Sequence, residues 1–98
     1  MLIHVILEHK SRSDRWAPLQ ALRYVTAVLE HWHREHPDEP ALPLVLPIVV
    51  HHGNAAWHGP RNTLDLFALD RLPPELRAPW TELLPRLGYL LIDLPTMT

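Results

Sequence analysis

The sequence contains no cysteine, only three glycines among 98 residues, and no strong excess of either charge. Without cysteine the chain has no disulfide framework, no thiolate zinc site and no cysteine nucleophile, which fits a reducing compartment. Nine basic residues against eleven acidic ones give a formal net charge of -2. The protein therefore has no overall positive field that draws it onto DNA or a membrane, and any affinity for nucleic acid must come from a local patch.

Long apolar stretches are also absent. No run approaches the roughly 18 consecutive apolar residues that a transmembrane helix needs. The first residues lack the basic segment that opens a signal peptide. We therefore expect a cytoplasmic protein that does not enter a membrane.

The composition that remains is typical of one small domain over residues 1–98. Hydrophobic residues make up 47% of the chain and charged residues 20%, which indicates a globular rather than a disordered protein. Eleven prolines exclude one long helix. A chain of this size buries only about 65% of the surface that its unfolded form exposes, so its hydrophobic core is small.

The first half of the chain predicts a strand followed by a helix. Residues 2–8 are a short, almost continuous apolar run, which suits a strand buried on both faces. Apolar residues then recur every three or four positions, so we expect a helix over residues 15–35. Ser13 or Asp14 can cap this helix, and Pro18 is tolerated if it falls in the first turn.

The second half predicts a strand, a helix and a final strand. Residues 44–50 form another apolar run, in which Pro47 favours an edge or a bulged position. Residues 64–69 form an apolar segment of undecided type, the prolines at 73–74 open a helix, and residues 89–94 indicate the third strand. The inner side of the second helix is expected to carry Leu76, Trp80, Leu83, Leu84 and Leu87. This alternation predicts an α/β fold, strand-helix-strand-helix-strand.

The first candidate site is the pair Glu8 and Lys10 at the end of the first strand. Side chains alternate along a strand, so Glu8 and Lys10 share a face while His9 points to the other. The carboxylate can bind Mg²⁺, and the lysine can orient a water or stabilise charge that develops on a phosphate. Lys10, Arg12 and Arg15 form a local basic patch for phosphate contacts. A surface ion pair and a solvated loop are the alternatives for these residues.

Histidines supply a second set of candidates. His31, His33 and His36 lie near the end of the long helix, where a pair such as His33 and His36 could chelate a metal or interact with the helix dipole. His51 and His52 end the second strand and point to opposite faces, so they do not easily share one ligand.

The order of several short motifs resembles a known family. The motifs are LEHKS at 7–11, PL at 18–19, LRY at 22–24, LP at 42–43, PIVVHHG at 47–53, LDL at 64–66 and YLLIDL at 89–94. Together they resemble the Rpn, or YhgA-like, recombination-promoting nucleases, also called PD-(D/E)xK nuclease family transposases. The resemblance covers nearly all of the chain.

The resemblance implies a partial PD-(D/E)xK, restriction-endonuclease-like core and Mg²⁺-dependent cleavage of DNA. It implies that Glu8 is the motif carboxylate that binds the metal. Lys10 takes the last motif position, where many family members have glutamine. The carbonyl group of His9 is an additional metal ligand in this interpretation.

Two further motifs have supporting roles by the same resemblance. Arg23 and Tyr24 match the LRY of the following helix and support the site or the core. His52 and Gly53 match a tyrosine-histidine-glycine turn, with His51 in the place of the tyrosine.

One departure from the family concerns the first catalytic residue. In the superfamily this residue is an Asp on the strand before the E-x-K strand, which here would precede Met1. Asp14 and Asp93 have no place at the site in this interpretation. We therefore expect the chain to be the later part of a larger nuclease fold, lacking the N-terminal strands and with impaired or no activity. The alternative is a non-catalytic remnant that binds DNA or dimerises, with a second copy or a partner chain covering the exposed N-terminal strand.

Overall fold

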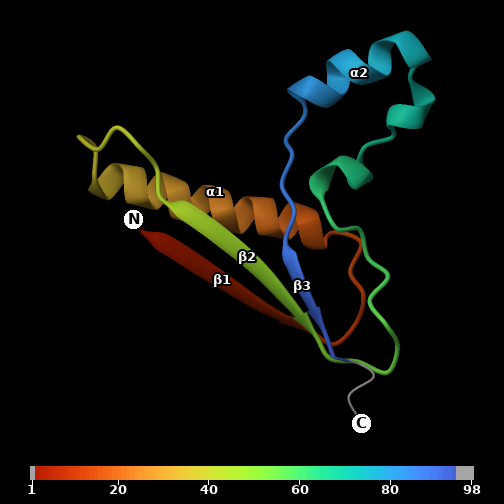
Figure 1. Cartoon of the computed structure of the whole chain (residues 1–98), viewed down its shortest axis with the longest axis horizontal. Helices are drawn as coiled ribbons and strands as arrows, with labels where there is room; N and C mark the ends of the chain where they lie inside the picture. Colours follow the sequence, from red (N-terminus) through yellow and green to blue (C-terminus); the bar gives the residue numbers. More distant parts are fainter. Residues whose placement is uncertain (1, 95–98) are drawn as a thin grey trace.

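A computed structural model describes residues 2–94. The chain forms two layers, one sheet and one helix, from which an arm projects (Figure 1). The elements in chain order are β1 (Ile3–Lys10), α1 (Ala17–Glu35), β2 (Leu44–His51), the 3-10 helices η1 (Thr63–Leu66) and η2 (Leu69–Arg71), α2 (Pro74–Leu83) and β3 (Leu90–Asp93). The strands form a parallel sheet in the order β1-β2-β3, and α1 packs on one face of it. The α/β prediction is confirmed, while the finer assignment to a partial PD-(D/E)xK core stays a prediction.

The central position of β2 contradicts the edge position expected from Pro47. Leu44 and His52 donate their N–H groups to carbonyls at either end of β1, so the even-numbered N–H groups of β2 point toward β1. The nitrogen of Pro47 therefore points toward the β3 side. Pairing with β3 begins only at Ile48, which faces Leu90. Proline is tolerated here because the sheet requires no hydrogen bond from the nitrogen at this position.

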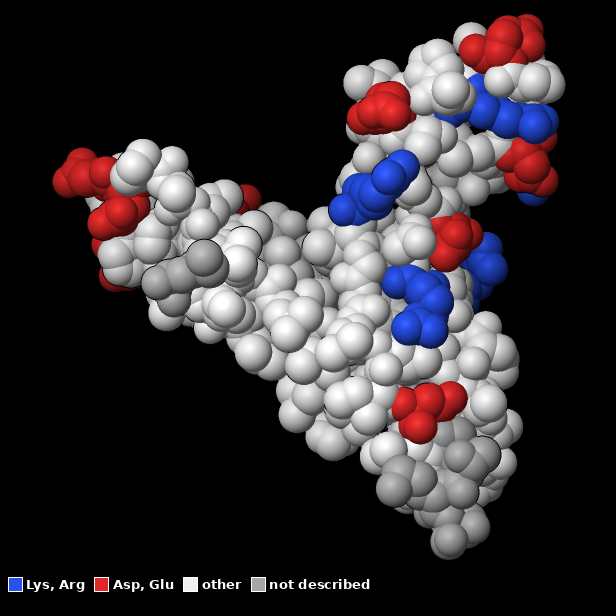
Figure 2. Space-filling model, in the orientation of Figure 1, with Lys and Arg blue, Asp and Glu red and all other residues white. Residues whose placement is uncertain are grey.

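The sheet is covered on one face only, so the expectation of a strand buried on both faces was wrong. Along β1 the even-numbered side chains are partly buried under α1, whereas the odd-numbered ones are exposed. Figure 2 shows no charged residues over the middle of the uncovered face, and the molecule measures only 17 Å across its thinnest axis. The described part of the chain thus has two layers where a buried parallel sheet has three.

The core lies between α1 and the sheet. It consists of Ala17, Ala21, Val49 and Tyr89, with Trp57, Leu87 and Leu91 packed against it. Small residues on α1 let the helix approach the strands closely. Pro18 falls in the first turn, as predicted. Asp14 accepts from the N–H of Trp16 rather than from the helix itself, so the predicted side-chain cap is wrong. Within the described residues no helix has the length and apolar character needed to cross a membrane.

Residues 67–86 form an arm that stands away from the sheet and α1, whereas η1 before it contacts α1 and Leu87 after it packs against the core (Figure 1). Thr63 fixes its base, because its backbone N–H donates to the Leu87 carbonyl and its hydroxyl donates to the Pro85 carbonyl. α2 buries no residue, and the side chains expected on its inner side are largely exposed. The expectation was wrong for Leu76, Trp80 and Leu83, because α2 packs mainly on η2. Leu87 follows the end of α2 and does pack against the core.

Candidate active site

The carboxyl ends of the three parallel strands meet at one edge of the sheet, the edge at which open α/β sheets bind ligands. Lys10 is the register partner of His51, and His51 is the register partner of Asp93. Because partners in register share a face, these side chains form a row on the side covered by α1. Glu8 lies two residues earlier on β1, on the same face, as predicted.

Lys10 joins two carboxylates at this edge. Its Nζ lies 2.9 Å from Oδ2 of Asp14 and 4.0 Å from Oε1 of Glu8. The hydrogen bond from Lys10, helped by one from the Trp16 N–H, holds the pKa of Asp14 below its usual value, although burial opposes this. The Lys10 side chain is 13% exposed and that of Glu8 is 32% exposed. Asp14 thus neutralises much of the Lys10 charge, and Glu8 is the less engaged carboxylate.

Glu8 also lines a narrow cavity between the sheet and the first half of α1. Gln20 and Tyr24 line the same cavity, and Gln20 Nε2 donates to the Tyr24 hydroxyl over 3.2 Å. Arg23 is exposed, with its guanidinium 5.5 Å from the centre of the Tyr24 ring. Of the two residues expected to support the site, Tyr24 reaches the Glu8 side of the sheet and Arg23 lies on the surface.

The oxygen atoms around Glu8 suit a magnesium ion that is shared with substrate. Mg²⁺ in phosphate-processing sites commonly takes one or two carboxylates together with waters and phosphate oxygens. The His9 carbonyl points away from β2, because the next carbonyl, that of Lys10, accepts from the N–H of His52. Glu8 and His9 can therefore offer two oxygens at the outer edge of β1. No group of three His, Cys, Asp or Glu side chains gathers into a metal site within residues 2–94.

His51 and Asp93, the other two members of the row, take part in a hydrogen-bond network. His51 is buried, and its Nδ1 lies 2.8 Å from Oδ1 of Asp93. The second oxygen of Asp93 accepts from the backbone N–H of Trp57 over 2.8 Å. Trp57 Nε1 donates to the Tyr89 hydroxyl, which donates to the Pro60 carbonyl. The loop that follows β2 is thereby held on the end of β3, and the end of the sheet is fixed in shape.

His52 and Gly53 shape the turn after β2. The N–H of His52 donates to the Lys10 carbonyl over 3.0 Å, while the His52 side chain is exposed. A Cβ on Gly53 would lie 2.6 Å from the Ser11 carbonyl oxygen and 2.9 Å from His51 Nε2. This close approach accounts for the glycine after the two histidines.

The predicted basic patch is split by the structure. Lys10 is largely enclosed by its ion pairs, whereas Arg12 and Arg15 are exposed on the loop after β1. Arg15 lines a hollow of about 500 Å³ together with Ser13 and His58, and the Ser13 hydroxyl accepts from the N–H of His58. The two arginines are therefore the exposed members of the predicted patch.

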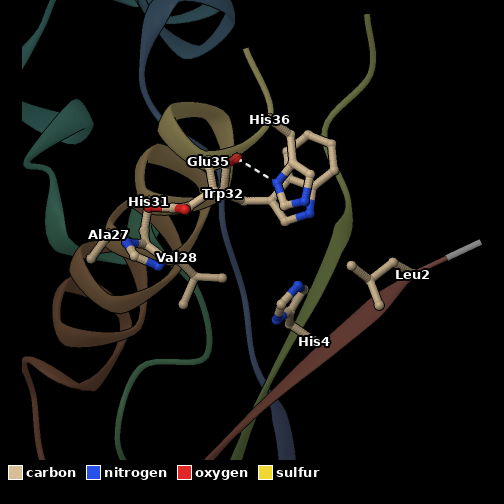
Figure 3. A pocket seen from close by; sticks show the side chains of 8 residues that line it. All are labelled: Leu2, His4, Ala27, Val28, His31, Trp32, Glu35 and His36. Atoms are coloured by element: carbon tan, nitrogen blue, oxygen red, sulfur yellow. Dashed lines mark hydrogen bonds between the residues drawn. The ribbon is translucent and has the colours of Figure 1, made fainter. Parts of the chain in front are cut away.

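The histidine-rich end of α1 lies at the opposite end of the sheet from Lys10. An open pocket of about 520 Å³ lies there, and Figure 3 shows the side chains that line it, from the start of β1 and the second half of α1. His36 stacks on Trp32 with ring centroids 4.4 Å apart. His31 lines this pocket while His33 lines a separate hollow, so the three helix histidines do not converge. Two ring nitrogens of pocket-lining residues, Nε2 of His4 and Nε1 of Trp32, are buried without a protein partner.

Sequence reasoning missed the positions of Asp14 and Asp93. Asp14 follows β1, but the loop turns back and brings its carboxylate to Lys10. Asp93 reaches His51, 42 residues earlier in the chain, because the strands are parallel and in register. One sequence signal could have found part of this row. Each apolar strand ends in a polar residue, and parallel strands bring such ends together.

Comparisons with known proteins identify relatives of the chain. The model of a family described as "Putative transposase, YhgA-like" matches residues 1–98. The recombination-promoting nuclease RpnD of Escherichia coli O157:H7 is 40% identical over 52 residues, which cover 53% of this chain and 20% of that protein. The recombination-promoting nuclease RpnC of Escherichia coli strain K12 is 40% identical over 53 residues, which cover 54% of this chain and 17% of that protein. No solved structure matches.

Proposed function

Because the chain belongs to the YhgA-like transposase family, we propose that it carries part of the active site of a metal-dependent DNA endonuclease. The observation that supports this most directly is the placement of Glu8 and Lys10 on one face of β1, at the carboxyl edge of the sheet. A carboxylate there can bind a metal ion, and the ammonium group beside it can stabilise negative charge on a phosphate.

In this proposal Glu8 and the His9 carbonyl hold the magnesium ion. When bound, the ion neutralises phosphate charge and activates a water. The Lys10 ammonium group stabilises the negative charge that develops on the phosphate, and the ion pair with Asp14 keeps Nζ beside Glu8. Arg12 and Arg15 contact neighbouring phosphates and position the DNA.

The matched stretch covers a fifth or less of the two nuclease relatives, so the activity of the whole protein is part of the proposal. Within the described residues, Glu8 is not joined by two further His, Cys, Asp or Glu side chains that could hold a metal with it. We therefore propose low activity for the isolated chain, with a second metal-binding carboxylate supplied from outside these residues.

Nicking of supercoiled plasmid with Mg²⁺ tests the function. Glu8→Gln and Lys10→Met should each lower the nicking rate at least about tenfold, because each removes a charge that acts on the phosphate. Glu82→Gln, an exposed change on α2, should leave the rate unchanged. Equal nicking by Glu8→Gln and the wild type would refute catalysis by this site.

Metal binding offers a second measurement that does not depend on turnover. Mn²⁺ should broaden the amide NMR signals of Glu8 and His9 before those of the rest of the sheet, and Glu8→Gln should abolish this. DNA binding with neither nicking nor metal-induced broadening would favour the alternative, a DNA-binding module without catalysis.

A further inference from the structure

We propose that two copies of this chain form a dimer in which α2 of each copy packs on the open face of the other copy's sheet. This inference does not depend on the nuclease activity. It rests on two apolar surfaces of the same chain, one flat and one helical, that the described residues leave without a partner.

The first surface is the sheet face opposite α1, here called the open face. Its exposed side chains are Ile3, Val5, Leu7, Leu44, Leu46, Leu90 and Ile92. They are between 40% and 58% exposed, and they come from all three strands, the central strand β2 included. Parallel sheets are almost always covered on both faces by helices. Figure 2 shows no acidic or basic residue over the middle of this face, so an apolar partner meets no charge there.

The second surface is the apolar stripe of α2, formed by Leu76, Trp80 and Leu83. The spacing places all three on one side of the helix, and Leu83 is 76% exposed. Arg77 does not shield the stripe, because its guanidinium is bound to the carbonyls of Leu72 and Asp70 on the η2 side. An amphipathic helix with no buried residue gains stability only when its stripe meets another apolar surface.

The arm points away from its own sheet, which favours a second copy over closure within one chain. The bonds of buried Thr63 to Leu87 and Pro85 clamp the two stems of the arm together at its base. Closure onto the same sheet would therefore require the whole clamped arm to swing about its base. The radius of gyration is 16.1 Å, whereas a compact chain of this length has about 13 Å. The chain is therefore extended in the way that exchange of an element between copies requires.

The size of the contact fits a stable dimer. Reciprocal packing places two helices on two sheet faces, and it buries on the order of 1,500 Å² of mostly apolar surface in total. The arrangement is two-fold symmetric and closed, so the open face and the α2 stripe of both copies are buried. Neither surface is then free to bind a third copy.

Sedimentation or light scattering of the full chain across micromolar concentrations tests the proposal. The wild type should be dimeric. Leu83→Glu on the arm and Val5→Glu on the open face should each raise the dimer dissociation constant at least about 100-fold, since each places a charge in both contacts. Leu19→Glu, an equally exposed position on α1, is the matched control and should remain dimeric.

The two variants also separate the competing arrangements. A dimer that survives Leu83→Glu would show stacking of two sheets, and one that survives Val5→Glu would show pairing of two arms. Either result, or a monomeric wild type, overturns the proposal. Mixing the two variants should restore part of the dimer, because the mixed pair keeps one intact helix-on-sheet contact. Circular dichroism checks that Leu83→Glu, on the exposed arm, stays folded.

Discussion

His51 and Asp93 end neighbouring parallel strands, and Nδ1 of His51 lies 2.8 Å from Oδ1 of Asp93. Since a carboxylate only accepts hydrogen bonds, His51 donates through Nδ1. The same carboxylate binds the N–H of Trp57. One acidic side chain thus fixes the end of the central strand and the loop that follows it.

This arrangement makes stability depend on pH. Partial burial opposes ionisation of Asp93, but hydrogen bonds from the Trp57 N–H and from His51 outweigh it and lower the pKa of Asp93 below the usual 3.8. The stabilisation is therefore present above that pH and is lost as the pH falls through the lower folded value. Asp93→Asn should unfold at a lower temperature at pH 7 and should lose less stability on acidification than the wild type. Thermal melts between pH 2 and 7 check this, with Asp38→Asn in an exposed loop as control.

The Lys10–Asp14 ion pair should limit the affinity for DNA. Lys10 is the only lysine of the chain, and Asp14 holds its Nζ at 2.9 Å. Asp14→Asn should tighten binding because it frees that charge, whereas Lys10→Met should weaken it and reduce the salt dependence by about one phosphate contact. Fluorescence anisotropy between 50 and 200 mM salt measures both. Weaker binding by Asp14→Asn would contradict the proposed role of Lys10.

Gly53 is required by close packing. A methyl group there would lie 2.6 Å from the Ser11 carbonyl oxygen, so Gly53→Ala should destabilise the fold by about 1–3 kcal/mol. Gly88→Ala is a milder control, because its nearest neighbour would be 3.2 Å away. Urea denaturation compares the two. Equal stability would show that the turn relaxes without cost.

Thr63 should be critical for the arm. Its side chain is buried and bonds to Pro85 and Leu87, so Thr63→Val leaves two backbone groups unpaired and should cost about 1–3 kcal/mol for each. Thr81→Val removes a similar hydroxyl–carbonyl bond at an exposed site and should cost much less. Hydrogen exchange at the base of the arm gives the local measure, and unchanged protection in Thr63→Val would rule out the clamp.

The buried nitrogen of His4 predicts a stabilising substitution. Nε2 of His4 has no protein partner, so His4→Leu removes an unpaired polar group and should raise stability by about 1 kcal/mol. His9→Leu on the exposed side of the same strand serves as the control. A loss of stability in His4→Leu, measured by urea denaturation, would show that this nitrogen is paired in solution.

The local sequence pattern was sufficient to predict most of the helices and strands. The predicted helix over 15–35 and strands over 44–50 and 89–94 match α1, β2 and β3 closely, because periodicity and proline positions depend on nearby residues. The shared face of Glu8 and Lys10 follows from strand geometry in the same way. The roles of Glu8, Lys10 and the arginines in metal and DNA binding stay predictions.

The position of Pro47 in a central strand and the exposure of Leu83 depended on what lies beside each element. Pro47 is tolerated because β3 begins one residue later along the sheet, and α2 is exposed because the arm leads it away from the core. The sequence by itself therefore determined the helices, the strands and the E-x-K spacing, which depend on interactions between residues close in the chain. Only the tertiary structure decided that Lys10, His51 and Asp93 form one row and that one sheet face stays open, because both depend on register and packing between segments far apart in the chain.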